Sequence, residues 1–261
     1  MFDVAGETVL FLALAAFFAG FMDSIAGGGG LITVPALLLA GLSPVESLGT
    51  NKLQGLFGTA SATISYASKG HVDLRKQMAS AWLSFAGGAA GAAAATVMPS
   101  AALEAMLPFL LIAVALFFAF KPRLDDDDRT RRITPFVFGL TVVPFIGFYD
   151  GAFGPGTGSF LMLAFVALAG HGVLKATAHT KLLNFASNIG GFFAFAAAGV
   201  VVWKIGLLMG VLQFLGARAG AGLAMKNGAK LIKPLLVLVC LALAAKLMAE
   251  PDNPVRLWIT Q

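Results

Sequence analysis

Apolar segments, each long enough to form a membrane helix, follow one another along most of the chain. They lie at about 7–26, 45–67, 77–97, 102–120, 133–150, 176–198, 204–225 and 231–249. A run of about 20 apolar residues matches the thickness of a bilayer when it folds as an α-helix. The pattern therefore predicts an all-α polytopic membrane protein, surrounded by the lipid bilayer.

Two more apolar segments, at about 30–41 and 158–170, are shorter, and each follows a cluster of glycines. At about 1.5 Å per residue each would reach roughly 20 Å, which is less than a hydrocarbon core of about 30 Å. We expect each to form a hairpin or a broken helix with the segment before it. Each half of the chain would then hold this hairpin and three full transmembrane helices. Alternatively, each half crosses the membrane five times.

A charged run at 121–132 interrupts the apolar pattern and divides the chain. We predict a first transmembrane repeat at 1–120, a charged cytoplasmic linker at 121–132, a second repeat at 133–250 and a short polar tail at 251–261. Of all residues, 58% are hydrophobic and 12% are charged, whereas a soluble domain carries about a quarter charged residues. No part of the chain is long and polar enough to form a separate soluble domain.

The charge and the cysteine count exclude several classes of partner. Basic residues retained in cytoplasmic loops explain the net charge of +5 better than a nucleic acid partner does. The single cysteine, Cys240, leaves no intramolecular disulfide and no thiolate metal cluster. The sequence also lacks a nucleotide-binding loop, metal-ligand spacing and a nucleophile–base motif. We therefore expect no catalytic residue, cofactor or metal, and no pumping driven by ATP.

The second half repeats the polar landmarks of the first. Asp150 follows Asp23 by 127 positions, and each precedes a glycine cluster. Lys181 follows Lys52 by 129 positions, after a two-residue insertion. Because a charged residue and a glycine cluster are both costly in an apolar helix, their coincidence indicates internal duplication.

Loop charges predict that the two repeats are inserted with opposite orientation. In the first half the basic loop follows the segment 45–67 and carries Lys69, Arg75 and Lys76. In the second half the basic loop is one segment later and carries Lys226, Lys230 and Lys233. Since basic loops stay in the cytoplasm, equivalent loops lie on opposite sides, as in inverted repeats. Both termini would then be non-cytoplasmic.

The glycine clusters are candidate anion-binding sites, because each opens a short helix. The first N–H groups of a helix lack internal partners, and the helix dipole makes that end partly positive. Missing side chains let an anion approach those N–H groups. Close packing between helices is the alternative explanation. The candidate residues are Gly27, Gly28, Gly29, Gly30, Gly154, Gly156, Thr157, Gly158 and Ser159.

Lys52 and Lys181 are the second candidate feature, because a lysine within a bilayer costs about 2.5–3.5 kcal/mol. We favour charge complementarity to a small anion, with snorkelling or pairing to Asp23 and Asp150 as the alternative. The two aspartates are also candidates for the uptake of a coupling proton. Polar neighbours that would face the same cavity are Thr50, Asn51, Gln54, His179, Thr180, Asn184 and Asn188. For His179, a hydrogen-bonded core position is the usual alternative.

The glycine-rich turn, Pro35-Ala36 and Gly49-Thr50-Asn51-Lys52, with the matching second-half residues, resemble the TauE/SafE sulfite exporter family. The resemblance covers nearly the whole chain. It implies a carrier of the bacterial inner membrane for small sulfur-containing or carboxylate anions, such as sulfite or sulfoacetate. The second copy departs from the first, because Ala178-His179-Thr180-Lys181 stands where the first has Gly49-Thr50-Asn51-Lys52.

Residues and resemblance together predict a secondary transporter that exports a small inorganic or organic anion by alternating access. Two alternatives are kept: an anion channel lined by the same residues, and a non-transporting membrane scaffold in which the polar stripes pack without a cavity. A homo-oligomer is compatible with the sequence.

Overall fold

The computed structural model describes residues 6–103, 105–106, 109, 112–113, 128 and 130–227. The predicted spans at 102–120 and 231–249 lie wholly or largely outside this part of the chain. The same holds for most of the linker, the tail at 251–261, Lys230 and Lys233.

The described part of the chain folds into helices joined by turns, without a strand. The first half forms α1 (Gly6–Ala26), α2 (Gly30–Leu39), α3 (Pro44–Ala67) and α4 (Met78–Val97). The second half forms a continuous segment of α6 (Pro135–Val137), the π-helix η1 (Phe138–Val142) and α7 (Val143–Ala152), followed by α8 (Thr157–Ala167), α9 (Val173–Ala197) and α10 (Trp203–Asn227). The predicted all-α class is confirmed, and α2 and α8 are the short helices that the sequence predicted.

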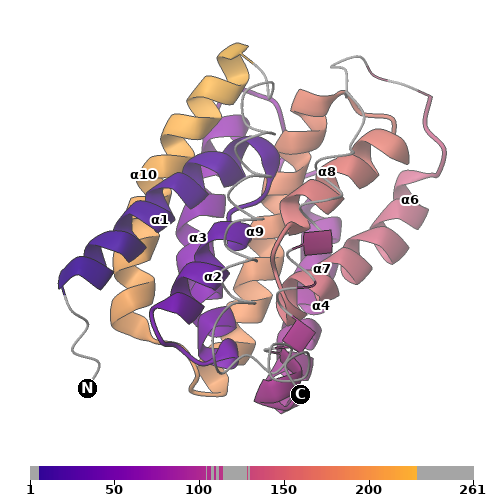
Figure 1. Ribbon diagram of the computed structural model, residues 1–261. Helices are drawn as coiled ribbons and strands as arrows, with labels where there is room; N and C mark the ends of the chain where they lie inside the picture. The colour runs from indigo at the N-terminus through magenta and orange to yellow at the C-terminus, as the bar shows by residue number, and fades with distance from the viewer. Residues whose placement is uncertain are drawn as a thin grey trace.

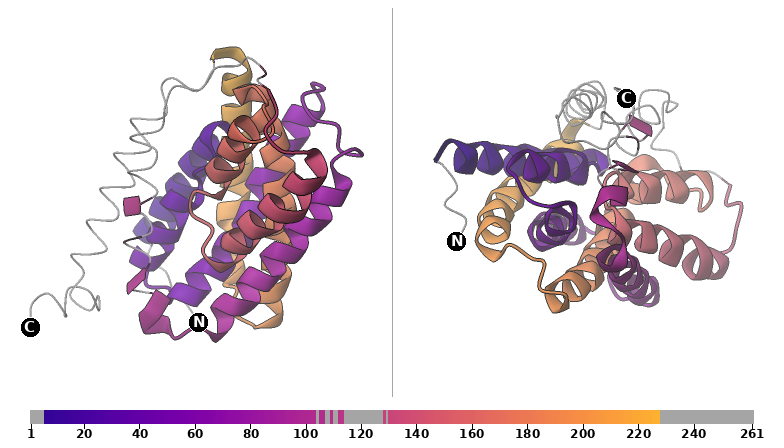
Figure 2. Two further views of the ribbon diagram at one scale, coloured as in Figure 1. Left: turned by 90° about the vertical axis from the view of Figure 1, so that its right-hand side faces the viewer. Right: turned by 60° about the horizontal axis from the view of Figure 1, so that its bottom comes forward.

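Three described helical segments are long and apolar enough to cross a membrane: Gly6–Ile25, Pro135–Ala152 and Trp203–Lys226. Helices α3 and α9 are as long, with 24 and 25 residues, but buried polar side chains lower their hydropathy. Figures 1 and 2 place α3 and α9 between two groups, with α1 and α10 on one side and α4, α7 and α8 on the other. The least apolar long helices are therefore shielded by the more apolar ones.

The packing of the bundle occurs twice, each time between the two halves. Helix α1 packs along α10, and α7 packs along α4. In the first pair Gly220 lies against the carbonyl oxygen of Phe21, and in the second Gly91 lies against that of Phe148. The phenylalanines are 127 positions apart and the glycines 129, which are the offsets of the sequence repeat. These contacts between helices therefore recur at the offsets from which the sequence predicted a duplication.

The equivalent helices α3 and α9 pack against each other and run antiparallel. A Cβ added to Gly49, near the start of α3, would lie 3.2 Å from the Cβ of Phe195, near the end of α9. A Cβ added to Gly55, further along α3, would lie 3.0 Å from Asn188 Oδ1, which is earlier on α9. Side chains from the two equivalent helices therefore face each other in the middle of the bundle.

Basic residues gather at one end of the bundle, which we call the basic end. The loop after α3 meets the start of α9 there, because Gln77 Nε2 donates a hydrogen bond to the His179 carbonyl at 3.3 Å. The backbone N–H of Arg132 donates to the Leu168 carbonyl at 2.9 Å and brings the residues before α6 to the same end. The described basic residues at this end are Lys69, Arg75, Lys76, Arg131, Arg132, Lys175 and Lys226.

Candidate functional site

Two glycine-rich turns meet at the centre of the molecule. The first tip, residues 27–30, joins α1 to α2, and the second tip, residues 154–159, joins α7 to α8. Gly27, Gly154 and Gly156 have φ values of +78°, +89° and +82°, which glycine adopts at little cost. A Cβ on Gly27 would overlap the backbone of Gly158, and Ser159 Oγ donates to the Gly27 carbonyl at 3.2 Å. Glycine therefore permits both the turns and their close contact.

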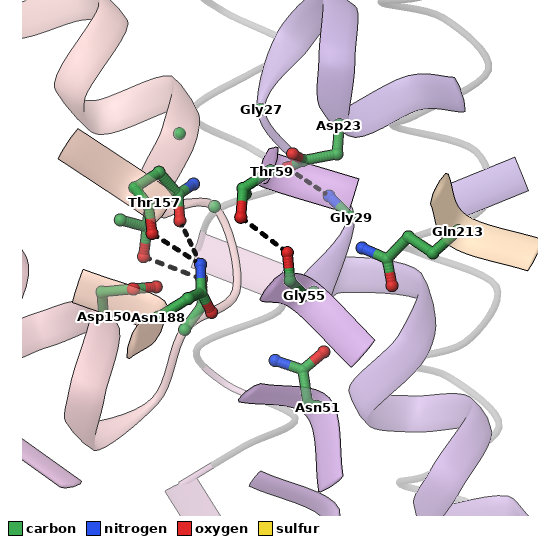
Figure 3. Close-up of a pocket in the computed structure, with 15 residues that line it drawn as sticks. Asp23, Gly27, Gly29, Asn51, Gly55, Thr59, Asp150, Thr157, Asn188 and Gln213 are labelled. Carbon is green, nitrogen blue, oxygen red and sulfur yellow. Dashed lines mark hydrogen bonds between the residues drawn. The ribbon is translucent and has the colours of Figure 1, made fainter. Parts of the chain in front are cut away.

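A small polar cavity lies beside the tips and is lined by both halves of the chain (Figure 3). Its volume is about 30 Å³, which is enough for about two water molecules. A sulfonate or a comparable anion needs more room, so the tips or side chains must move to admit one. The lining residues are Asp23, Gly27, Gly29, Gly30, Asn51, Gly55, Thr59, Asp150, Gly154, Gly156, Thr157, Gly158, Asn184, Asn188 and Gln213.

Each buried lysine forms an ion pair with the aspartate of the other half. Lys52 Nζ lies 2.9 Å from Asp150 Oδ1, and Lys181 Nζ lies 3.2 Å from Asp23 Oδ2. The lysine side chains are 1% and 0% exposed, so the snorkelling alternative is wrong and the pairing alternative describes this structure. The four charges sum to zero, and the two pairs tie each central helix to the opposite hairpin.

The two aspartates have different further partners. Asp23 Oδ1 accepts a hydrogen bond from the backbone N–H of Gly29 at 3.2 Å, so this carboxylate binds the first tip. Asp150 Oδ2 instead accepts from Ser187 Oγ on α9 at 2.6 Å. A carboxylate at the start of a short helix shows that the first tip accommodates negative charge, as its dipole favours.

Most of the predicted site residues line the cavity, and the others lie outside its lining. Lys52 and Lys181 do not line the cavity but pair with Asp150 and Asp23, which do. Gly28 and Ser159 belong to the tips without lining the cavity. Thr50 Oγ1 accepts from the Val202 N–H at 3.0 Å and so supports the loop before α10.

The remaining predicted residues lie further from the cavity. Gln54 Nε2 donates to the lining residue Asn51 at 3.1 Å. Thr180 is buried beside Lys181 without lining the cavity. The His179 ring packs near the basic end, with ring centroids 5.5 Å from Phe165 and 4.9 Å from His171.

Three lining residues were missed by sequence reasoning: Gly55, Thr59 and Gln213. Gly55 and Thr59 precede Asn184 and Asn188 by 129 positions each, so the repeat alignment contained the signal. Figure 3 shows Gln213 reaching the cavity from α10. Its counterpart, Ser84, is fully buried and donates to the Leu183 carbonyl instead, so the alignment could not have indicated Gln213.

Comparison with known proteins points to a family of membrane transporters. The family profile described as sulfite exporter TauE/SafE matches residues 12–247. The probable membrane transporter protein ORF9 of Sinorhizobium sp is 61% identical, with 99% of each chain covered. The probable membrane transporter protein YfcA of Escherichia coli (strain K12) is 47% identical over 92% of this chain and 89% of its own. A probable membrane transporter protein of Haemophilus influenzae is 44% identical over 95% and 97%. No solved structure matches the chain.

Proposed function

The chain belongs to the TauE/SafE sulfite exporter family of membrane transporters, and on this premise we propose that it is a secondary transporter of small anions. The substrate is sulfite or an organosulfonate such as sulfoacetate, moved outward across the bacterial inner membrane by alternating access. The family description supports the sulfur oxyanion, and the site described above supports an anion that binds between the two halves.

The observation that carries this proposal is the meeting of two glycine tips at a buried polar cavity, beside two buried lysines. The tips present the starts of α2 and α8, where backbone dipoles favour negative charge. The amides of Asn51, Asn184 and Asn188 supply side-chain donors for oxygen atoms. Lys52 and Lys181 supply the positive charge. These are the groups that an oxyanion requires when it leaves water.

We further propose that the two halves are inverted repeats, inserted with opposite orientation. The antiparallel packing of α3 and α9 supports this relation, because equivalent helices of repeats inserted in the same direction would run parallel. The gathering of basic residues at one end supports its assignment to the cytoplasm. Helix α1 starts at the opposite end, so the N-terminus is non-cytoplasmic, and the C-terminus lies on the same side if the last predicted span crosses the membrane.

The size of the cavity favours a carrier over the channel. The cavity beside the packed tips has a volume of only about 30 Å³, which is too small for a continuous pore. An anion would pass the tips only if the tips or the halves move. A cavity also lies where the scaffold alternative requires dry packing.

Purified protein in liposomes tests the proposal. Counterflow is measured with sulfite, sulfoacetate, taurine and thiosulfate, and Lys52→Ala and Lys181→Ala are compared with Lys204→Ala, which removes an exposed lysine. We expect saturable counterflow of at least one of these solutes and a loss of about tenfold or more in both site variants. Non-saturating current without counterflow would indicate the channel. Unchanged flux in both site variants would remove the chemical basis of the proposal.

A further inference from the structure

The two buried ion pairs are equivalent in the repeat, but their surroundings are not equivalent. Lys181 Nζ donates to both the main-chain carbonyl and the carboxylate of Asp23. Asp23 is also held by the N–H of Gly29 in the first tip. Both the lysine and the aspartate of the Lys181–Asp23 pair therefore have further hydrogen-bond partners, and the pair joins the end of α1 to α9. These are the contacts of a fixed structural link.

The Lys52–Asp150 pair is less well satisfied. Lys52 Nζ is buried 2.9 Å from Asp150 Oδ1, and the part of the chain that the structure describes gives it no further hydrogen-bond acceptor. An ammonium carries three N–H donors, and a buried one is costly when donors are left without acceptors. Lys52 is therefore a fully buried cation that can donate hydrogen bonds to further oxygen atoms.

The ammonium group of Lys52 lies next to the second tip and to the cavity. A Cβ added to Gly154 would lie 3.3 Å from Lys52 Nζ and 3.5 Å from Asn51 Nδ2. Gly154 and Asn51 both line the cavity. Because Gly154 has no side chain, none separates this part of the cavity wall from the ammonium, and Asp150, which pairs with Lys52, also lines the cavity. An oxyanion in an enlarged cavity would reach Lys52, the Asn51 amide and the start of α8 together.

Charge balance then decides what happens to Asp150. With Lys52 charged and Asp150 ionised, the pair is neutral, and a bound anion would add a net negative charge next to a carboxylate in a buried site. Like charges at this separation disfavour each other, and protonation of the carboxyl group relieves the repulsion. One proton on Asp150 returns the pair and the anion to zero net charge.

We infer that the transported anion binds Lys52 in place of Asp150, and that Asp150 takes up one proton from the same side as the anion arrives. This inference rests on the proposed function and deepens it, because it makes the protein a carrier that moves an anion and a proton together. Transport of a monovalent anion is then electroneutral. Lys181 and Asp23 position the first tip and do not exchange partners.

The groups that surround Asp150 are consistent with this role. From α3 it faces Lys52, and from α9 it faces the hydroxyl of Ser187. On its own helix the neighbouring Tyr149 hydroxyl donates to the Pro155 carbonyl at 2.6 Å. Helices α4 and α8, which also pack on α7, carry no titratable side chain. Lys52 is therefore the charged partner whose loss the proton compensates.

Proton uptake on anion binding is the direct test. Methanesulfonate and sulfoacetate are added to the purified full-length protein in weakly buffered detergent solution containing a pH indicator, and anion binding is measured by calorimetry in parallel. We expect about one proton taken up per anion bound. The dissociation constant should then rise by about tenfold per pH unit wherever the carboxyl group is ionised before the anion binds, as linkage requires for one coupled proton.

Variants separate the two ion pairs. Asp150→Asn should reduce the uptake to near zero protons per anion and flatten the pH dependence of binding. Asp128→Asn, an exposed carboxylate at the basic end, is the matched control and should keep the ratio at about one. Lys52→Met should weaken binding by about tenfold or more. Asp23→Asn should lower the Tm, while the proton ratio of the remaining binding stays at about one.

Each outcome decides a different point. Anion binding without proton uptake by the unaltered protein would overturn the coupling and leave the proposed function standing. Loss of proton uptake in Asp23→Asn but not in Asp150→Asn would overturn the assignment to Asp150. If neither anion binds and none of the four solutes shows counterflow, the anion site itself is wrong, and the coupling is wrong with it.

Discussion

At the scale of single residues, the glycines of the tips determine how closely the two halves approach. Gly27 has a φ of +78°, and the backbone of the second tip occupies the place that a side chain on Gly27 would need. Gly154 combines a φ of +89° with Lys52 Nζ nearby. At both positions a side chain would strain the backbone and also occupy space that the site uses. These two effects can be separated, because Gly41 has the backbone requirement alone.

We predict that Gly27→Ala impairs both stability and transport, whereas Gly41→Ala affects stability alone. Gly41 has a φ of +89° and nothing within 4 Å of an added Cβ, so its substitution costs only the left-handed backbone, about 1–2 kcal/mol. Gly27→Ala adds a clash with the Gly158 backbone, for which overpacking costs about 1–3 kcal/mol more. The Tm in detergent and counterflow in liposomes measure the two effects. Equal losses in the two variants would show that the tips need not touch.

At the scale of elements, small residues let helices of the two halves pack with their backbones in contact. This is how membrane helices associate when apolar burial provides no driving force between them. Gly216 and Gly220 on α10 face α1, and Gly87 and Gly91 on α4 face α7. The outer helices thus hold the two hairpins in place through contacts at Phe21 and Phe148, a few residues before the tips.

We predict that Gly220→Ala is destabilising and that its neighbour Gly222→Ala is not. A Cβ on Gly220 would overlap the carbonyl of Phe21, six residues before the first tip, whereas a Cβ on Gly222 would meet nothing within 4 Å. We expect a loss of about 1–3 kcal/mol for the first variant from overpacking. The second should gain up to about 1 kcal/mol from helix propensity. Unfolding midpoints in detergent measure both, and a neutral Gly220→Ala would mean that α1 and α10 can separate without cost.

At the scale of the whole molecule, the doubled contacts give the protein an approximate two-fold relation between its halves. The relation is imperfect at the cavity, because Gly55 and Thr59 are the repeat equivalents of Asn184 and Asn188, and the buried Ser84 is the equivalent of Gln213. The asymmetry agrees with the unequal ion pairs, because both favour the second tip as the anion-binding side. We therefore propose that an approximately symmetric frame carries one distinct anion position.

Cysteine labelling tests the proposed inversion directly. In a Cys240→Ser background, single cysteines replace Ser68 after α3 and Ala198 after α9, two exposed positions at equivalent helix ends. We predict that a membrane-impermeant maleimide labels Ala198→Cys in intact cells and labels Ser68→Cys only after the membrane is opened, because we propose that the basic end faces the cytoplasm. Labelling of both positions from one side would contradict inverted repeats.

The helical class, the limits of most described helices, the two short helices and the repeated polar landmarks could be predicted from the sequence. This is possible because helix length against bilayer thickness and the cost of charge in an apolar segment are local properties of the chain. The sequence also gave most of the cavity lining, since tip glycines and central amides are conspicuous in an apolar chain.

The partners of the buried charges became known from the packing of the helices. The lysines pair with the aspartates of the opposite half, which the offsets allowed but could not select over snorkelling or a free anion site. Tertiary structure also brought Gln213 to the cavity and made the two ion pairs unequal. These features depend on contacts between helices about 100 positions or more apart in the chain, such as Lys52 with Asp150 and Lys181 with Asp23. Spacing along one helix carries no information about which side chains lie opposite on another.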